Sequence, residues 1–304
     1  PTPQYSWPLL NQKLGFEVWV KHENHTPIGA FKIRGGITYV DWLKRTQPDI
    51  RGICTATRGN HGQSQAKAAT SLGLKTKVFV PEGNSVEKNA AMAAFGAEVV
   101  VSGKDYDEAS DAAKKAAEAE GLSIVPSFHT ELVRGVSTYA LEFFTQSPAL
   151  ATVYVPIGCG SGICGVIAAR DALGLRTKIV GVVSERAQAP KLSAEAGVMI
   201  ETESAKTFAD GIAVRIPVKA ALDIYSAGAE RFVAVSDDDI AEAMRLLYTT
   251  THNVAEGAGA APLAGLLKDR DQMRGQRVGI ILCGGNIDRD IFVTVLNGET
   301  PICH

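Results

Sequence analysis

Cysteine is scarce in this sequence, and the spacing of the few that occur excludes both a C-x-x-C pair and a zinc site of cysteine and histidine. There are five, an odd number, with no C-x-x-C pair and no grouping with histidine at zinc-site spacing. We therefore expect reduced thiols, as in a cytosolic protein, and no bound metal. The five are Cys54, Cys159, Cys164, Cys283 and Cys303.

Long apolar runs, runs of one charge and rows of aromatic residues are also missing. The apolar stretches, such as residues 278–283, are interrupted by glycine and far shorter than the ~20 residues of a membrane-spanning helix. A net charge of −2 without a Lys/Arg-rich run leaves no electrostatic footprint for nucleic acid. No charged-then-apolar leader follows Pro1. We expect a cytoplasmic protein that binds neither membranes nor nucleic acid.

The order of short β-rich and alanine-rich segments predicts parallel sheets covered by helices. A chain of 304 residues exceeds the usual size of one hydrophobic core, so we expect two lobes. Because no low-complexity linker is present, the second lobe is expected as an insertion in the first. Strands are predicted at 52–56, 77–80, 98–102, 123–125, 152–156, 178–183, 231–235 and 277–282. Helices are predicted at 63–72, 85–95, 107–120, 131–145, 163–173 and 237–250.

Three of the predicted strands run into glycine-rich loops that are each expected to open a helix. These loops are residues 57–62, 157–162 and 283–286. Ligands of open α/β sheets bind outside the carboxyl ends of the strands, so the loops could converge on one anionic ligand. The loop Gly158-Cys159-Gly160-Ser161-Gly162 offers backbone N–H groups and a hydroxyl at a helix start, which suits a phosphate.

Lys32 has unusual neighbours for a lysine. It lies in P-I-G-A-F-K-I-R-G-G (residues 27–36), where small and aromatic residues crowd the amine. Partial desolvation favours the neutral amine, which can attack a carbonyl. A helix-start lysine with a solvated head is the simpler alternative.

Residues 160–165 also satisfy G-x-G-x-x-G, and Glu185 follows about twenty residues later. By itself this pattern is a dinucleotide fingerprint and would indicate an NAD-dependent dehydrogenase. That interpretation leaves Lys32 and the Asn60 loop unexplained.

Five motifs resemble, in order and spacing, those of pyridoxal-phosphate enzymes of fold type II, in the threonine dehydratase and serine racemase family. Residues 27–36 resemble P-T-G-S-F-K-x-R-G, and residues 59–63 resemble G-N-H-x-Q. Residues 156–162 resemble the tetraglycine phosphate loop, 207–214 resemble T-I-A-D-G-I-A-V, and 283–286 resemble S-G-G-N. The resemblance covers nearly the whole chain.

The resemblance implies a fold of the tryptophan synthase β type, with two open, twisted, mostly parallel sheets and flanking helices. The large cofactor-binding domain would comprise residues 1–53 and 132–304, and the small inserted domain residues 54–131. Lys32 would bind pyridoxal 5′-phosphate covalently and remove the substrate α-proton. The resemblance also implies a homodimer.

The remaining site residues follow from the same resemblance. Phe31, Asn60, Cys283 and Glu256 would contact or support the cofactor, and the loop from Gly158 to Gly162 would hold its phosphate. The substrate carboxylate would be bound by Thr57, Arg58, Gly59, Asn60 and His61.

Cys283 and Arg58 depart from the family pattern. Cys283 replaces a serine beside the pyridine nitrogen, and a neutral thiol does not hold that nitrogen protonated, which favours elimination over transamination. Arg58 stands where racemases have a proton-accepting serine, and a guanidinium does not accept a proton. It could instead pair with a second anionic group of the substrate, or point into solvent.

Other departures concern metal binding and regulation. Ser184 and Pro190 replace a glutamate and an aspartate of metal-dependent relatives, so we expect no cation site there. Because the chain ends shortly after residue 286, we expect no regulatory domain.

The predicted reaction is α,β-elimination of a β-hydroxy amino acid of the L-threonine/L-serine class to a 2-oxo acid and ammonia. The alternatives are a dehydratase for 3-hydroxyaspartate or phenylserine, an amino-acid racemase, an NAD-dependent dehydrogenase and a non-catalytic binding module.

Overall fold

The computed structural model describes residues 1–302, which divide into two compact units. The larger unit comprises Pro1–Phe31 and the chain from Val136 on, and the inserted unit is Lys32–Gly135. We describe each unit by itself.

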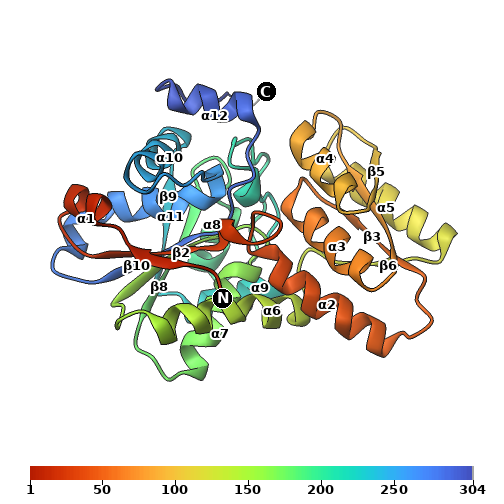
Figure 1. Cartoon of the computed structure of the whole chain (residues 1–304), viewed down its shortest axis with the longest axis horizontal. Coiled ribbons are helices and arrows are strands. Elements are labelled where there is room, and N and C mark those ends of the chain that lie inside the picture. The colour runs from red at the N-terminus through yellow and green to blue at the C-terminus, as the bar shows by residue number, and fades with distance from the viewer. Residues whose placement is uncertain (303–304) are drawn as a thin grey trace. The chain divides into compact units, whose positions relative to one another are not determined.

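A six-stranded sheet organises the larger unit, in the order β1-β2-β10-β7-β8-β9 (Figure 1). Every neighbouring pair is parallel except β1 and β2, which are antiparallel. The carboxyl ends of β2, β10, β7, β8 and β9 therefore meet at one edge of the sheet. The strands are β1 Gln4–Ser6, β2 Val18–His22, β7 Thr152–Pro156, β8 Lys178–Ser184, β9 Arg231–Val235 and β10 Val278–Leu282.

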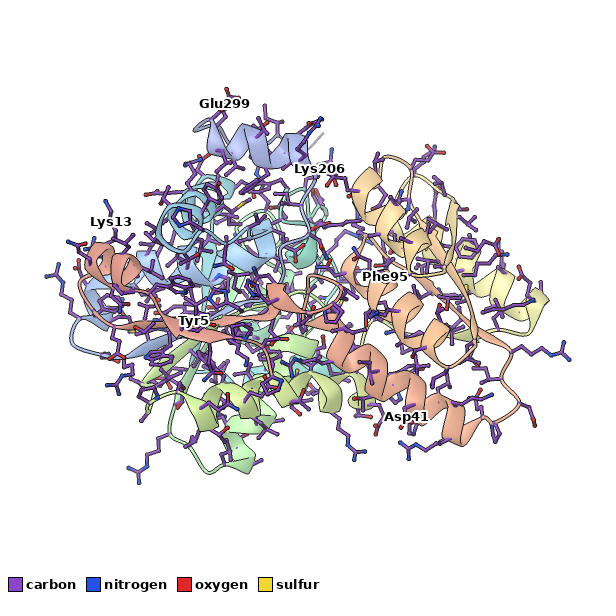
Figure 2. The ribbon with its side chains drawn as sticks, viewed as in Figure 1. Tyr5, Lys13, Asp41, Phe95, Lys206 and Glu299 are labelled. Atoms are coloured by element: carbon purple, nitrogen blue, oxygen red, sulfur yellow. The ribbon has the colours of Figure 1, made fainter. Side chains whose placement is uncertain are left out.

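Helices cover both faces of this sheet. A Cβ on Gly265 of α11 would meet Val182 of β8, whereas a Cβ on Gly279 of β10 would meet Phe143 of α6 on the other face. The charged side chain of Lys13 projects outward at the end of α1 (Figure 2). The helices with residues in this unit are α1 Pro8–Leu14, α6 Thr130–Gln146, α7 Ser161–Ala172, α8 Ala189–Ala196, α9 Lys219–Gly228, α10 Asp237–Thr251, α11 Gly257–Lys268 and α12 Arg289–Leu296, with 3-10 turns at Glu23–His25, Asp210–Ile212 and Arg270–Met273.

The inserted unit contains a parallel four-stranded sheet in the order β5-β4-β3-β6. Cys54 and Phe79 point to the small residues of α5, while Val78 and Val80 point to the layer of α3 and α4. The strands are β3 Gly52–Ala56, β4 Lys75–Val80, β5 Glu98–Val101 and β6 Ser123–Ile124; the helices are α2 Lys32–Thr46, α3 Asn60–Ser71, α4 Val86–Ala94 and α5 Tyr106–Glu120.

Packing places the unit boundaries at residues 32 and 135, not at the expected 54 and 131. The reason is α2, whose Tyr39, Val40 and Leu43 share a core cluster with Ile53 and the α3 alanines. Helix α2 thus belongs to the inserted unit through its apolar face. The α/β class with mostly parallel sheets is confirmed.

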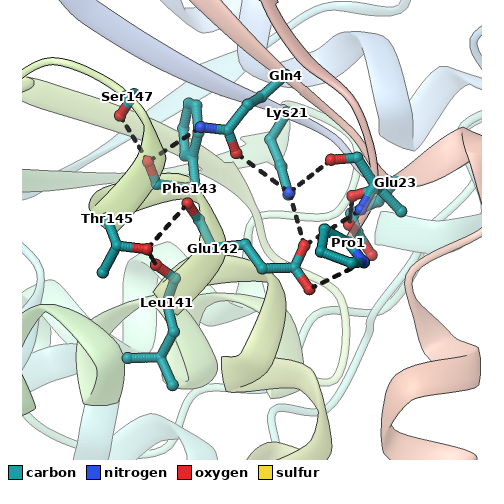
Figure 3. A network of polar contacts seen from close by, with 10 residues as sticks. Pro1, Gln4, Lys21, Glu23, Leu141, Glu142, Phe143, Thr145 and Ser147 are labelled. Carbon is teal, nitrogen blue, oxygen red and sulfur yellow. Dashed lines mark hydrogen bonds and ion pairs between the residues drawn. The ribbon is translucent and has the colours of Figure 1, made fainter.

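A buried lysine anchors the amino-terminal strands to α6. Lys21 is fully buried, and its Nζ lies 2.8 Å from Oε2 of Glu142 and 3.0 Å from the carbonyl oxygen of Thr2 (Figure 3). Gln4 accepts a third hydrogen bond from this ammonium at 3.2 Å. Because its donors are paired, this buried ammonium has a structural role.

Candidate active site

Two glycines shape the loop between β7 and α7 in the larger unit. A Cβ on Gly158 would lie 2.3 Å from the carbonyl oxygen of Gly211, and one on Gly160 would lie 2.5 Å from Cβ of Ala221. Gly160 also has φ +97°, which favours glycine. Helix α7 begins at Ser161 without a side-chain cap, so its first N–H groups suit an anion. The loop is a narrow cradle that larger residues would fill.

Phe31 is fixed beside this cradle. Its backbone N–H donates to the carbonyl oxygen of Cys283 at 2.9 Å, and its ring packs edge-on against Tyr139 at 6.0 Å. A Cβ on Gly162 would lie 3.6 Å from Cζ of Phe31. The Tyr139 hydroxyl donates to the Gly162 carbonyl oxygen at 3.3 Å. Tyr139 therefore supports the cradle, although no sequence motif indicated it.

The loop after β10 lies against the segment before Lys32 and against Glu256. Gly284 forms an antiparallel bridge with Ala30, and the Gly285 N–H donates to the Gly29 carbonyl oxygen at 2.9 Å. A Cβ on Gly284 would lie 2.2 Å from Oε1 of Glu256, so the buried Glu256 carboxyl group lies beside this loop. The predicted residues Phe31, Cys283, Glu256 and the phosphate loop thus gather at one edge of the larger sheet.

The predicted substrate loop follows β3 in the inserted unit. The Gly59 N–H donates to the Thr57 hydroxyl at 3.0 Å, and Asn60 and His61 form the first turn of α3. Arg58 is exposed and has no hydrogen bond or ion pair within the part of the chain that the structure describes. The loop therefore brings together a hydroxyl, turn amides, an imidazole and a guanidinium.

Lys32 begins α2 and belongs to the inserted unit. Its carbonyl oxygen accepts a hydrogen bond from the Ser64 hydroxyl of α3 at 2.7 Å. Burial, reinforced by the nearby Lys32 ammonium, lowers the pKa of His61 to about 3. His61 is therefore a neutral imidazole near the amine. In the chain, Lys32 directly follows Phe31, the residue fixed beside the glycine cradle.

Sequence reasoning did not identify Lys88. Its side chain is only 6% exposed, and its Cδ lies 2.4 Å from the position of a Cβ on Gly59. The only sequence signal was Ser85, whose hydroxyl accepts from the Lys88 N–H and caps α4.

The segment from Ser184 to Pro190 is held by internal contacts. Ser184 accepts a hydrogen bond from the Arg186 N–H at 3.1 Å, and the Glu185 carboxylate pairs with the Lys268 ammonium at 2.8 Å. Within residues 1–302, no group of three His, Cys, Asp or Glu side chains is arranged to hold a metal. Within the same residues, no helix is both long and apolar enough to cross a bilayer. Cys54, Cys159, Cys164 and Cys283 form no disulfide bond among the described residues, and Cys303 lies outside them.

Comparison with known proteins identifies the family of this chain. Residues 1–284 match the family model described as "Pyridoxal-phosphate dependent enzyme". The chain belongs to this family. This match does not support the dinucleotide interpretation of residues 160–165.

Relatives of this family member agree on the type of reaction. The chain is 37% identical to an L-threonine ammonia-lyase of Geobacter sulfurreducens over 291 residues, which are 95% of the chain and 72% of the relative. It is 28% identical to an L-threo-3-hydroxyaspartate ammonia-lyase of Saccharomyces cerevisiae, over 98% of the chain and 91% of the relative. Threonine deaminase isoform 2 from Solanum lycopersicum superposes with a TM-score of 0.91 at 28% identity, over 97% and 87% of the two chains. The prediction of a pyridoxal-phosphate-dependent ammonia-lyase is confirmed.

The residues of the larger unit fit pyridoxal phosphate. The cradle of Gly158 and Gly160 is closed to any side chain and presents a helix start, as a phosphate requires. Cys283 is a buried thiol directly after β10, at the carboxyl edge of the same sheet.

Proposed function

We propose that this enzyme dehydrates and deaminates a β-hydroxy amino acid of the L-threonine/L-serine class. The observation that carries the proposal is the peptide bond between Phe31 and Lys32. Phe31 donates a backbone hydrogen bond to Cys283 and packs on Gly162. Lys32 is therefore the next residue in the chain after one that contacts the proposed phosphate cradle. Bound pyridoxal phosphate would supply an electron sink for the Cα carbanion.

Groups of the protein itself remove the proton and bind the substrate. The Lys32 amine removes the proton from the substrate Cα, and the β-hydroxyl then leaves with a proton as water. The turn amides of Gly59 to His61 and the Thr57 hydroxyl bind the α-carboxylate, which orients the Cα–H bond. The released enamine is hydrolysed by water to the 2-oxo acid and ammonia.

Three measurements test the proposal. The purified protein incubated with pyridoxal phosphate should show a visible absorption band that borohydride reduction removes and that Lys32→Ala lacks. It should release 2-oxo acid and ammonia in equal amounts from threonine or serine. A protein without the band or without 2-oxo acid release from any β-hydroxy amino acid would contradict it. Substrate recovered with α-deuterium and inverted configuration from deuterated water would instead indicate racemisation.

Arg58 favours a second candidate substrate, 3-hydroxyaspartate. Its guanidinium is exposed on the substrate loop and unpaired within residues 1–302, so a second carboxylate can reach it. Arg58→Ala should raise KM for 3-hydroxyaspartate by about tenfold and leave KM for threonine unchanged. Equal kinetics of the variant and the parent enzyme on both substrates would eliminate this candidate.

We also propose that the enzyme is a homodimer in the cytosol. Its four described cysteines form no disulfide bond within residues 1–302, which suits a reducing compartment. Light scattering of the purified protein gives the oligomeric state, and fractionation of the source cells gives the location.

A further inference from the structure

Helix α3 carries a glutamine whose side-chain amide is buried without a hydrogen-bond partner. Gln65 is 0% exposed, and neither its Oε1 nor its Nε2 bonds to any group among residues 1–302. Leaving a buried amide unpaired costs free energy, so native folds pair such groups with protein atoms or with ordered water. A small polar ligand is therefore expected beside this amide.

Gln65 points into the angle between α2 and the sheet of the inserted unit. On one side of it the Ser64 hydroxyl bonds to α2, and on the other side Ala66 packs with Val78 of β4. Ala69, four residues further on and therefore on the same side of α3, shares a core cluster with residues of α2 and β3. The amide is thus enclosed by a helix and a sheet that offer mostly apolar neighbours.

His61 lies one turn before Gln65 on this side of α3. Its Nε2 is likewise buried and has no hydrogen-bond partner within the part of the chain that the structure describes. Helical side chains lean toward the amino-terminal end of the helix, so Gln65 leans over the turn that contains His61. Cβ atoms four residues apart are about 5–6 Å apart, and two atoms that bond to one water are at most about 6 Å apart. Because a direct bond would have paired both groups, the spacing suits one water between them.

The adjoining strand offers the same water a third partner. Ile53 of β3 packs with the last turn of α3, and Thr57, directly after β3, contacts its first turn. Thr55 lies between these two on the same side of the strand, and therefore at the level of Gln65. The Thr55 hydroxyl donates to a carbonyl oxygen at 3.0 Å, so its oxygen can still accept a hydrogen bond. A buried water needs about two to four polar partners, which these side chains supply.

We propose that Gln65, His61 and Thr55 bind one buried water molecule, and that Gln65 through this water fixes the tautomer and orientation of the His61 imidazole. Burial lowers the pKa of His61 to about 3, so the ring is neutral near neutral pH and has one N–H and one acceptor nitrogen. The bond at one nitrogen decides which nitrogen carries the proton. Gln65 is thus a positioning residue for the loop Thr57–His61, and only this role rests on the proposed function of the loop.

Crystallography of the parent protein tests the water directly. One water should lie within about 3.2 Å of both the His61 Nε2 and the Gln65 amide. Gln65→Met keeps the length of the side chain without the amide and should lack this water. A direct bond between His61 and Gln65, or well-ordered density without a water between them, would overturn the proposal.

Nitrogen NMR of protein labelled at histidine tests the effect on His61, whose signals are those missing from His61→Asn. The parent should show the ring-nitrogen signals of one tautomer, whereas in Gln65→Met both signals should move toward the average of two tautomers. His129 is the internal reference, because its Nδ1 accepts the Glu131 N–H at 3.1 Å and so has its own fixed tautomer. Gln47→Met makes the same chemical change at an exposed position of the same unit and should leave the His61 signals in place. Unchanged His61 signals in Gln65→Met would overturn the positioning role.

Stability and kinetics complete the test. The urea midpoint should fall in Gln65→Met, because the His61 Nε2 loses its partner; a rise would show an uncompensated amide and overturn the proposal. A misaligned imidazole should raise KM for threonine about tenfold with kcat changed far less, and Gln47→Met should change neither. Unchanged kinetics in Gln65→Met would overturn the link to the substrate loop. A parent protein that has the water and the single tautomer but turns over no substrate would contradict the proposed function alone.

Discussion

Two glycine-rich loops of this enzyme, each proposed to hold an anion, differ in the charge of their side chains. The loop Gly158–Gly162 of the larger unit has no ionisable group other than a thiol, and Gly211 and Ala221 leave no room for a Cβ on Gly158 and Gly160 respectively. The loop Thr57–His61 of the inserted unit carries Arg58 and lies against the stem of Lys88. Under the proposed roles, fixed amides alone would hold a permanent phosphate, whereas charge would attract a substrate that must enter and leave.

The largest expected effect comes from the residue at the junction of the two units. Lys32→Ala removes the amine that we propose takes the Cα proton, so kcat should fall at least about a thousandfold. Stopped assays of 2-oxo acid with threonine measure this loss. The far-ultraviolet circular dichroism should stay unchanged, because the interaction of Ser64 is with the Lys32 carbonyl oxygen. Substantial turnover by a correctly folded Lys32→Ala protein would contradict the assignment.

Substitution by alanine should disrupt the cradle at Gly158 but not at Gly162. In Gly158→Ala the new Cβ meets the backbone oxygen of Gly211 at 2.3 Å, so the loop must shift. Such overpacking costs about 1–3 kcal/mol, which should weaken cofactor binding about ten- to a hundredfold. Gly162→Ala is the matched control, since its Cβ meets Phe31 at an ordinary 3.6 Å. Spectral titration with pyridoxal phosphate measures both, and equal affinities would show that the cradle tolerates displacement.

Each unit contains a buried histidine whose lowered pKa predicts how acid destabilises that unit. Burial lowers the pKa of His61 to about 3 and that of His22 to about 4, from ordinary values of 6.5. Below pH 6.5 the unfolded chain binds a proton that each folded imidazole does not, so the free energy of unfolding falls with decreasing pH until those lower values are reached. Each histidine contributes a slope of at most about 1.4 kcal/mol per pH unit.

Asparagine substitutions test the two histidines separately. His61→Asn and His22→Asn should each flatten the dependence of urea unfolding on pH between about pH 5 and about pH 7. His252→Asn, at an exposed position whose left-handed backbone asparagine tolerates, should not. An unchanged slope in either buried variant would assign the acid sensitivity to other groups.

The smallest effect is expected at Cys283. Cys283→Ser replaces one small neutral donor by another at a buried position, so kcat/KM for threonine should change by less than about tenfold. A larger loss would show that the thiol contributes more than a neutral contact.

Local patterns predicted part of the fold well. The strands β3, β7 and β9 have the predicted bounds, and the other predicted strands and helices lie within a few residues of theirs. Helix α2 was missed because Gly35 and Gly36 weaken its helical signal, and Gly36 is explained only by the close approach of Ser64. Helix α11 was missed because it is buried on all sides and has no polar face to reveal its period.

The residues of the candidate site also divide into those that local motifs predicted and those that they did not. The roles of Lys32, Asn60 and residues 158–162 came from contiguous motifs, and these remain predictions of individual function. Tyr139 and Lys88 lie in no motif, because each acts on a glycine that is distant in the chain, Gly162 and Gly59 respectively.

The sequence by itself determined the cofactor chemistry, the order of elements and the loops that end the strands, because each depends on residues that are neighbours in the chain. Only the tertiary structure decided that the inserted unit begins at Lys32, that Phe31 is pinned to Cys283, and that a buried ammonium lies under Gly59. The physical reason is that local periodicity reports which face of one segment is apolar, whereas close packing selects which distant segment covers that face.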